Sequence, residues 1–101
     1  MKKLSILLLI FISQLLIAQS PEELFTKANE AYADANYKEA TRLYKKIIQE
    51  DLQSSELHFN LANAYHKQGK VAPSIYHYEM ALLLSPGNKT YQNNLKFAQQ
   101  K

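Results

Sequence analysis

Residues 21–54 and 55–88 carry the same pattern of residue types, displaced by 34 positions. Five pairs of residues that coincide under this displacement are Ala28 and Ala62, Asn29 and Asn63, Ala40 and Ser74, Tyr44 and Tyr78, and Ile48 and Leu82. A repeat of this length indicates a supersecondary unit that cannot bury its apolar face alone and must stack on a neighbour. Because stacked units form an extended curved surface, the pattern favours binding over catalysis.

Each repeat reads as two amphipathic helices, which makes the chain all-α. Ser20 precedes Pro21 and two glutamates, which is typical of a helix start. From Leu24 the small residues recur at three- and four-residue spacing as far as Ala35, and a turn is expected at 34–36. Gly69 and the segment 85–88 indicate the ends of two further helices. After the first helix, the sequence predicts helices over 37–49, 56–68, 71–84 and 90–100.

The second repeat resembles the tetratricopeptide repeat (TPR). The positions typical of that family carry Leu61, Ala62, Tyr65, Gly69, Ser74, Tyr78, Ala81 and Pro86. The first repeat is looser, since Lys27, Ala31 and Leu52 replace the usual Leu, Tyr and Pro. The resemblance implies a short α-solenoid over 19–101, made of repeats 21–54 and 55–88 and a capping helix in 89–101. Small residues are expected where its helices cross.

The segments 70–86 and 93–98 also resemble the exported N-terminal TPR region of BatE-type bacterial aerotolerance proteins. Members of that family usually continue into a membrane-spanning part and an SH3-like domain. We therefore expect this chain to correspond to their N-terminal portion or to be a shortened relative.

The first 18 residues read as a secretory signal peptide. Lys2 and Lys3 precede a nearly unbroken apolar run from Leu4 to Ile17, and Ala18 is a small residue suited to cleavage. The run is shorter than a bilayer requires, although an uncleaved membrane anchor is the alternative. We expect an exported protein, in the periplasm or at the periplasmic face of the inner membrane.

The positive charge of the chain does not indicate nucleic-acid binding. Lys2 and Lys3 belong to the leader, and without them 10 of the 12 basic residues face 9 acidic ones. We expect no nucleic-acid partner, and membrane association only through a partner protein or a further segment. Because the sequence contains no Cys, disulfides cannot form.

The TPR resemblance predicts a peptide-binding groove lined by the first helix of each repeat. Asn29 and Asn63 would hold the backbone of an extended peptide, because an amide both donates and accepts. The residues expected in the groove are Phe25, Asn29, Tyr32, Phe59, Asn63, His66, Lys67, Asn93 and Phe97. The alternative is that these residues are ordinary features of the repeat. A clamp for a terminal carboxylate is not expected, since Phe25, Asn93 and Phe97 replace the cations that such a clamp needs.

We expect no bound metal, no cofactor and no catalytic site. The three histidines show no zinc spacing and read as surface or groove residues. With two glycines in the chain there is no phosphate-binding loop. The sequence therefore predicts an exported TPR adaptor for a protein or peptide partner. The alternative is a self-associating structural subunit, for which Tyr76 is a candidate outward-facing contact. A small periplasmic enzyme is the third option.

Overall fold

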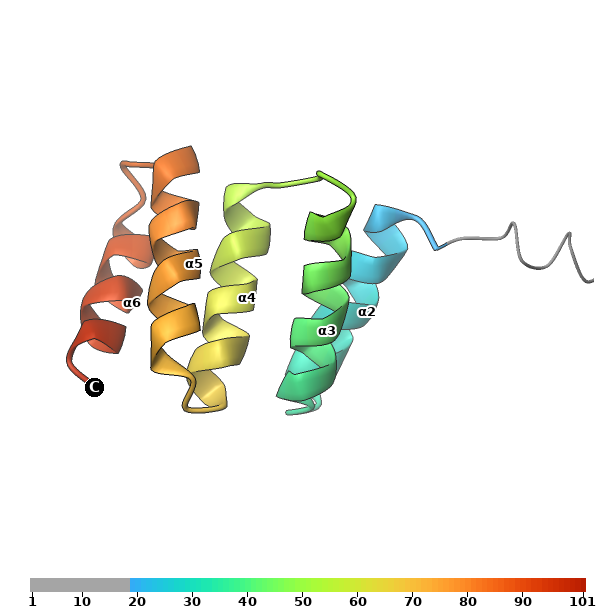
Figure 1. Cartoon of the computed structure of the whole chain (residues 1–101), viewed down its shortest axis with the longest axis horizontal. Helices are drawn as coiled ribbons and strands as arrows, with labels where there is room; N and C mark the ends of the chain where they lie inside the picture. Colours follow the sequence, from blue (N-terminus) through green and yellow to red (C-terminus); the bar gives the residue numbers. More distant parts are fainter. Residues whose placement is uncertain (1–18) are drawn as a thin grey trace, which may run out of the picture.

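A computed structural model describes residues 19–101, which form five α-helices joined by short turns (Figure 1). The helices are α2 (Pro21–Ala33), α3 (Tyr37–Gln49), α4 (Ser55–Lys67), α5 (Val71–Leu84) and α6 (Lys89–Gln99). No strand occurs in this range, so the predicted all-α class is confirmed. The predicted signal peptide, residues 1–18, lies outside the described residues.

Side-chain caps determine where the first helix of each unit begins. Ser20, Ser54 and Asn88 accept hydrogen bonds from the backbone N–H groups three residues later, at 3.2, 3.1 and 3.0 Å. Such bonds satisfy N–H groups that have no partner within the helix. As a result α4 and α6 each begin one residue earlier than the sequence predicted. They also end one residue earlier, whereas α3 and α5 have the predicted bounds.

The turn between the two helices of each repeat contains a residue with positive φ. Ala35 has φ of 62° and the equivalent residue of the second repeat, Gly69, has φ of 73°. Ala35 lies beyond the end of α2 and is exposed, which confirms the turn expected at 34–36, although the spacing of small residues had continued to Ala35. The backbone reversal, which favours glycine, ends the helix there.

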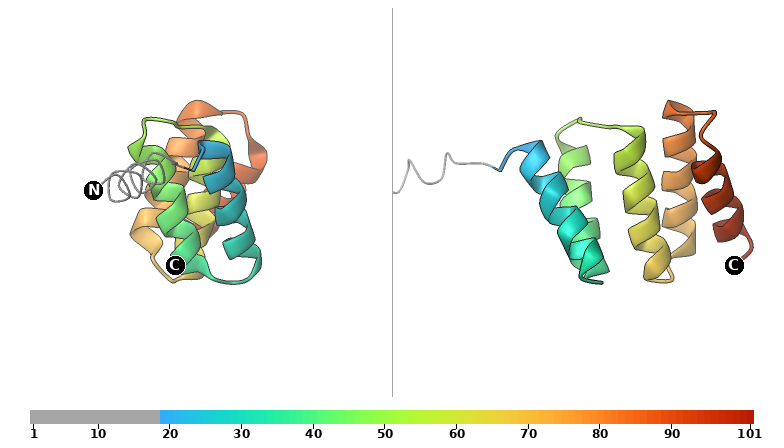
Figure 2. Two further views of the ribbon diagram at one scale, coloured as in Figure 1. Left: turned by 90° about the vertical axis from the view of Figure 1, so that its right-hand side faces the viewer. Right: turned by 180° about the vertical axis from the view of Figure 1, so that it is seen from behind.

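The helices stand side by side in chain order (Figure 1). Within the repeats α2 packs on α3 and α4 on α5, while α3 packs on α4 and α5 on α6 between successive units. Seen from the end of the row, α3 and α5 lie on one side, and α2 and α6 on the other (Figure 2). The second helices of the repeats therefore share a face opposite the first helices.

Small residues occupy the helix crossings, as predicted. Ala28 and Ala40 in the first repeat, and Ala62, Ser74 and Ala81 in the second, have no exposed surface. Larger side chains fill the space around them, including Leu24, Tyr44, Leu61 and Tyr78, which are all buried. A fully buried large apolar side chain contributes roughly 1.5–3 kcal/mol. The buried residues form two clusters, one from α2, α3 and α4 and one from α4, α5 and α6, so α4 contributes to both.

Both outer ends of the stack are polar. In α4 and α6 the face turned toward the preceding unit carries Leu57, Leu61 and Ala64, and Tyr91, Leu95 and Ala98. The equivalent positions of α2 carry the exposed residues Glu23, Lys27 and Glu30. At the other end, α6 carries Gln92, Lys96 and Gln99 where α4 carries His58, Ala62 and Tyr65. Burying these charged and amide groups against another copy would cost free energy.

Candidate functional site

Asn29 of α2 is held by two donors from the neighbouring helices. The Tyr44 hydroxyl of α3 donates to Asn29 Oδ1 at 2.5 Å, and Asn60 Nδ2 of α4 donates to the same oxygen at 3.3 Å. The second repeat contains the same arrangement. Tyr78 donates to Asn63 Oδ1 at 2.5 Å, and Asn94 Nδ2 of α6 donates to it at 3.2 Å.

These contacts determine what each asparagine can offer to a ligand. An amide oxygen has two lone pairs, and here the tyrosine and the following asparagine occupy both. Neither Asn29 Nδ2 nor Asn63 Nδ2 donates to another group within residues 19–101. The two predicted contact residues therefore present donors, not the donor–acceptor pairs that the sequence suggested. Asn60 and Asn94 leave their amide oxygens available as acceptors.

The two tyrosines remain protonated donors at physiological pH. Burial, followed by the charge that Tyr32 would carry, raises the pKa of Tyr44 to about 12. Burial also raises the pKa of Tyr78 to about 12. A tyrosine with its ordinary pKa near 10 is also protonated at this pH, so the raised pKa values extend to higher pH the range over which each hydroxyl can donate to its asparagine.

α2 and α4 share a cavity. A pocket of about 180 Å³ is lined by Asn29, Tyr32, Tyr44, Asn60 and Asn63. Three of these residues, Asn29, Tyr32 and Asn63, belong to the predicted groove. The two asparagines that are equivalent in the repeats thus border a common space.

A second pocket lies beside the connection between the repeats. It measures about 400 Å³, and its walls include Phe25, Ile47, Leu52 and Leu57, with Glu22 and Glu56 among its polar groups. Phe25 is the predicted groove residue found here. Its ring stands edge-on to Tyr44, with centroids 6.0 Å apart, so it is half-buried against the core. Apolar walls with two carboxylates suit an apolar or basic side chain.

The remaining predicted groove residues lie on α4 and α6. Phe59 stacks on Tyr91 at 4.4 Å between centroids and also contacts Tyr78, so it links α4 to its neighbours. His66 lies 5.5 Å from Phe97, and its Nδ1 is buried without a hydrogen-bond partner in the described structure. Lys67, Asn93 and Phe97 are exposed.

The sequence interpretation placed Asn29 and Asn63 on the groove but missed the residues that orient them. The sequence identified Tyr44 and Tyr78 as a pair that matches between the repeats, not as groove residues, and Asn60 and Asn94 were not included in the site. The available signal was spacing. The tyrosine donor lies 15 residues after Asn29 or Asn63, and the asparagine donor lies 31 residues after it. Both intervals recur in the two repeats.

A pair of histidines joins α4 to α5. His58 Nδ1 lies 3.0 Å from His77 Nδ1, and His58 Nε2 lies 2.9 Å from Gln53 Oε1. Because the Gln53 carbonyl accepts, neutral His58 carries its proton on Nε2 and accepts from His77 through Nδ1. His58 is buried, so its assignment as a surface or groove residue is wrong. Its polar ring is accommodated because both nitrogens are bonded.

The described residues contain no group of three or more potential metal-ligating side chains. No helix in residues 19–101 has both the length and the hydrophobicity needed to span a bilayer.

A family model supports the interpretation of the repeat. The model of the tetratricopeptide repeat matches residues 55–88, which have the same bounds as the second predicted repeat. No match was found among the curated proteins compared. Together with the helical architecture, the match supports a TPR protein and suggests a protein–protein interaction module. Proteins of this family are generally non-catalytic scaffolds.

Proposed function

We propose that the chain is an exported adaptor whose predicted groove holds an extended segment of a partner protein. The observation that carries this proposal is the cavity shared by Asn29 and Asn63. Their Nδ2 groups would donate to backbone carbonyls of the bound segment. Asn60 and Asn94 would accept backbone N–H groups through Oδ1, which gives two pairs of one donor and one acceptor, Asn29 with Asn60 and Asn63 with Asn94.

Side-chain pockets would add preference for particular segments. The pocket around Phe25 offers apolar walls and the carboxylates of Glu22 and Glu56. Aromatic side chains supply contact area at a low entropic cost. A segment with an apolar residue beside a lysine or arginine would fit this pocket best.

The sequence resemblance to BatE-type proteins supplies a cellular context. We propose that the adaptor works after export, in a membrane-associated complex linked to stress or oxygen tolerance. The apolar run from Leu4 to Ile17 supports export. The alternative role as a self-associating subunit that stacks end to end has less support, because both ends of the helical row are polar.

Position-specific cross-linking tests the adaptor role. A photoreactive residue at Tyr32 would face the cavity, whereas the same residue at Glu30 would face away from it on α2. In the native cell we expect a defined adduct from position 32 and none from position 30. Equal adducts from both positions, or none from position 32, would contradict the groove.

Two substitutions are unsuited to this test. Replacing Asn63 or Phe59 would also remove contacts that hold α5 and α6 in place. The exposed groove residues Lys67 and Asn93 are better probes, and their double replacement by alanine should weaken the adduct while leaving helicity unchanged. The N-terminus of the purified protein tests export separately, and we expect it at Gln19.

A further inference from the structure

The outward faces of α3 and α5 differ in chemistry although they occupy equivalent positions in the two repeats. The outward residues of α3 are Lys38, Arg42, Lys46 and Gln49, and their counterparts in α5 are Ala72, Tyr76, Met80 and Leu83. Tyr76 is 56%, Leu83 73% and Leu84 54% exposed. Within 71–84 the one carboxylate is Glu79. α5 is therefore apolar on its solvent side as well as on its buried side.

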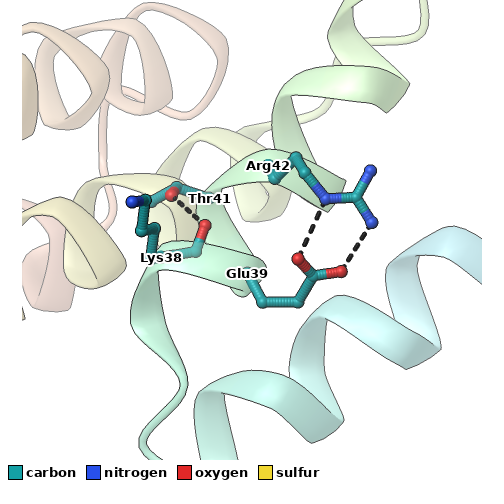
Figure 3. Close-up of polar contacts among 4 residues, drawn as sticks. All are labelled: Lys38, Glu39, Thr41 and Arg42. Atoms are coloured by element: carbon teal, nitrogen blue, oxygen red, sulfur yellow. Dashed lines mark hydrogen bonds and ion pairs between the residues drawn. The ribbon is translucent and has the colours of Figure 1, made fainter.

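The outward face of α3 is basic. A pocket of about 610 Å³ runs along α3, and its lining includes Lys38, Lys45, Lys46 and Lys70. Glu39 is the carboxylate in this lining, and it forms an ion pair with Arg42 (Figure 3). Arg42 Nε lies 2.9 Å from Glu39 Oε2, and Thr41 Oγ1 donates to the Lys38 carbonyl at 2.7 Å. The pair is locally neutral, so the four lysines set the charge of the pocket.

The basic and apolar parts are adjacent. Lys70 precedes α5 directly and lines the same pocket as the α3 lysines. Lys45 of α3 lies near enough to His77 to lower the pKa of that ring, after the larger effects of burial and of His58. The end view shows α3 and α5 on one side of the row (Figure 2). We call this surface, formed by Lys38, Lys45, Lys46, Lys70, Tyr76, Leu83 and Leu84, the outer face.

We propose that the outer face binds the surface of an anionic phospholipid bilayer. Lysines would contact the phosphates, and Tyr76 with the two leucines would enter the interfacial region, the combination found in proteins that lie on membranes. A protein partner fits less well, since lysine is depleted in protein–protein interfaces while exposed apolar anchors there fill pockets of the partner. The near-neutral total charge of the domain concealed this face, because acidic residues on another helix, such as Glu23 and Glu30 of α2, offset its lysines.

Tryptophan fluorescence tests the proposal, because the chain contains no Trp. A Tyr76→Trp variant of the full chain would report contact at the outer face, and a Tyr32→Trp variant would report contact at the predicted groove. The probes are vesicles of phosphatidylcholine alone and vesicles of phosphatidylcholine with phosphatidylglycerol. A leader retained on the purified protein would be common to all variants, so differences between them come from the domain.

We expect the emission of Trp at position 76 to shift to the blue with anionic vesicles and to be quenched by brominated lipids. Replacing Lys38, Lys45, Lys46 and Lys70 by glutamine should weaken this response at least about tenfold. A matched variant with glutamine at Lys27, Lys89, Lys96 and Lys101 should respond like the parent. Salt of about 1 M should abolish the response, because charges are then screened beyond about 3 Å.

Several outcomes would overturn the proposal. An equal response to neutral vesicles would assign binding to apolar contact or to the leader. An equal loss in the two glutamine variants would show an effect of total charge rather than of this face. A blue shift that appears without vesicles and grows with protein concentration would indicate that a second copy of the chain covers this face. If vesicles left the spectrum unchanged and the outer face captured an acidic protein, a protein partner would be favoured.

Discussion

Tyr44 and Asn29 form a hydrogen bond of 2.5 Å that links the two helices of the first repeat. The same bond joins Tyr78 to Asn63 in the second repeat. Each bond fixes the amide plane and so determines which atoms of the asparagine face a ligand. The core and the predicted groove are therefore coupled through one hydroxyl in each repeat.

Removing either hydroxyl should destabilise the fold. We expect Tyr44→Phe and Tyr78→Phe each to lower the free energy of unfolding by about 1 kcal/mol, because the amide oxygen loses the closer of its two donors in a partly buried place. Urea denaturation followed by circular dichroism measures this change. Tyr76→Phe is the control and should be neutral, since its ring is exposed. If Tyr44→Phe were as stable as the parent, the bond would have no net role.

Exchanging the residues at the two turns should have opposite effects. Ala35 and Gly69 both have positive φ, which disfavours a side chain. Ala35→Gly should raise the free energy of unfolding by up to about 1 kcal/mol, and Gly69→Ala should lower it by about the same amount. No atom lies within 4 Å of a Cβ added at Gly69, so its cost would come from the backbone alone.

Thermal denaturation of both variants checks this prediction. A stabilising Gly69→Ala change would contradict the positive φ assigned to this turn.

Acidification should weaken the contact between α4 and α5. Burial, His58 and Lys45 lower the pKa of His77 to about 4, and burial lowers that of His58. Between the His77 pKa of about 4 and the ordinary histidine pKa near 6.5, the unfolded chain binds more protons than the folded one. The free energy of unfolding therefore falls as the pH decreases through this window. Since the His77 ring is half-buried, the loss should be about 1 kcal/mol after allowance for solvent screening.

Melting temperatures at pH 7 and pH 5 measure this effect. His77→Gln keeps a donor for His58 and should reduce the difference, because carboxylates titrate equally in both proteins. An unchanged difference in the variant would remove His77 as its source.

The domain should be a monomer in dilute solution without membranes. End-to-end stacking would bury Glu23, Lys27 and Glu30 against Gln92, Lys96 and Gln99 with no apolar gain. Sedimentation equilibrium of the purified protein measures its mass directly. Replacement of Lys27 and Lys96 by leucine should promote association if the polar ends keep the copies apart, and a dimeric parent would contradict this account.

The repeat made most of the fold predictable. Buried small residues such as Ala62 and Ser74 mark the helix crossings, and caps placed the helix ends within one residue. Spacing alone could not reveal that Asn29 Oδ1 is already occupied, because its donors come from two other helices. His58 was misassigned for a similar reason, since its partner His77 comes from a different helix. The outward position of Tyr76 was predicted and is confirmed by its exposure.

The most direct test of the central claim uses the side-chain amide signals of Asn29 and Asn63 in a ¹⁵N-labelled protein. A peptide that corresponds to the partner segment cross-linked from position 32 would be titrated into the sample. We predict that both Nδ2H₂ signals shift in proportion to binding, while the backbone signals of Tyr76 and Leu83 remain unchanged. Saturable binding that leaves both asparagine amides unmoved would contradict the account.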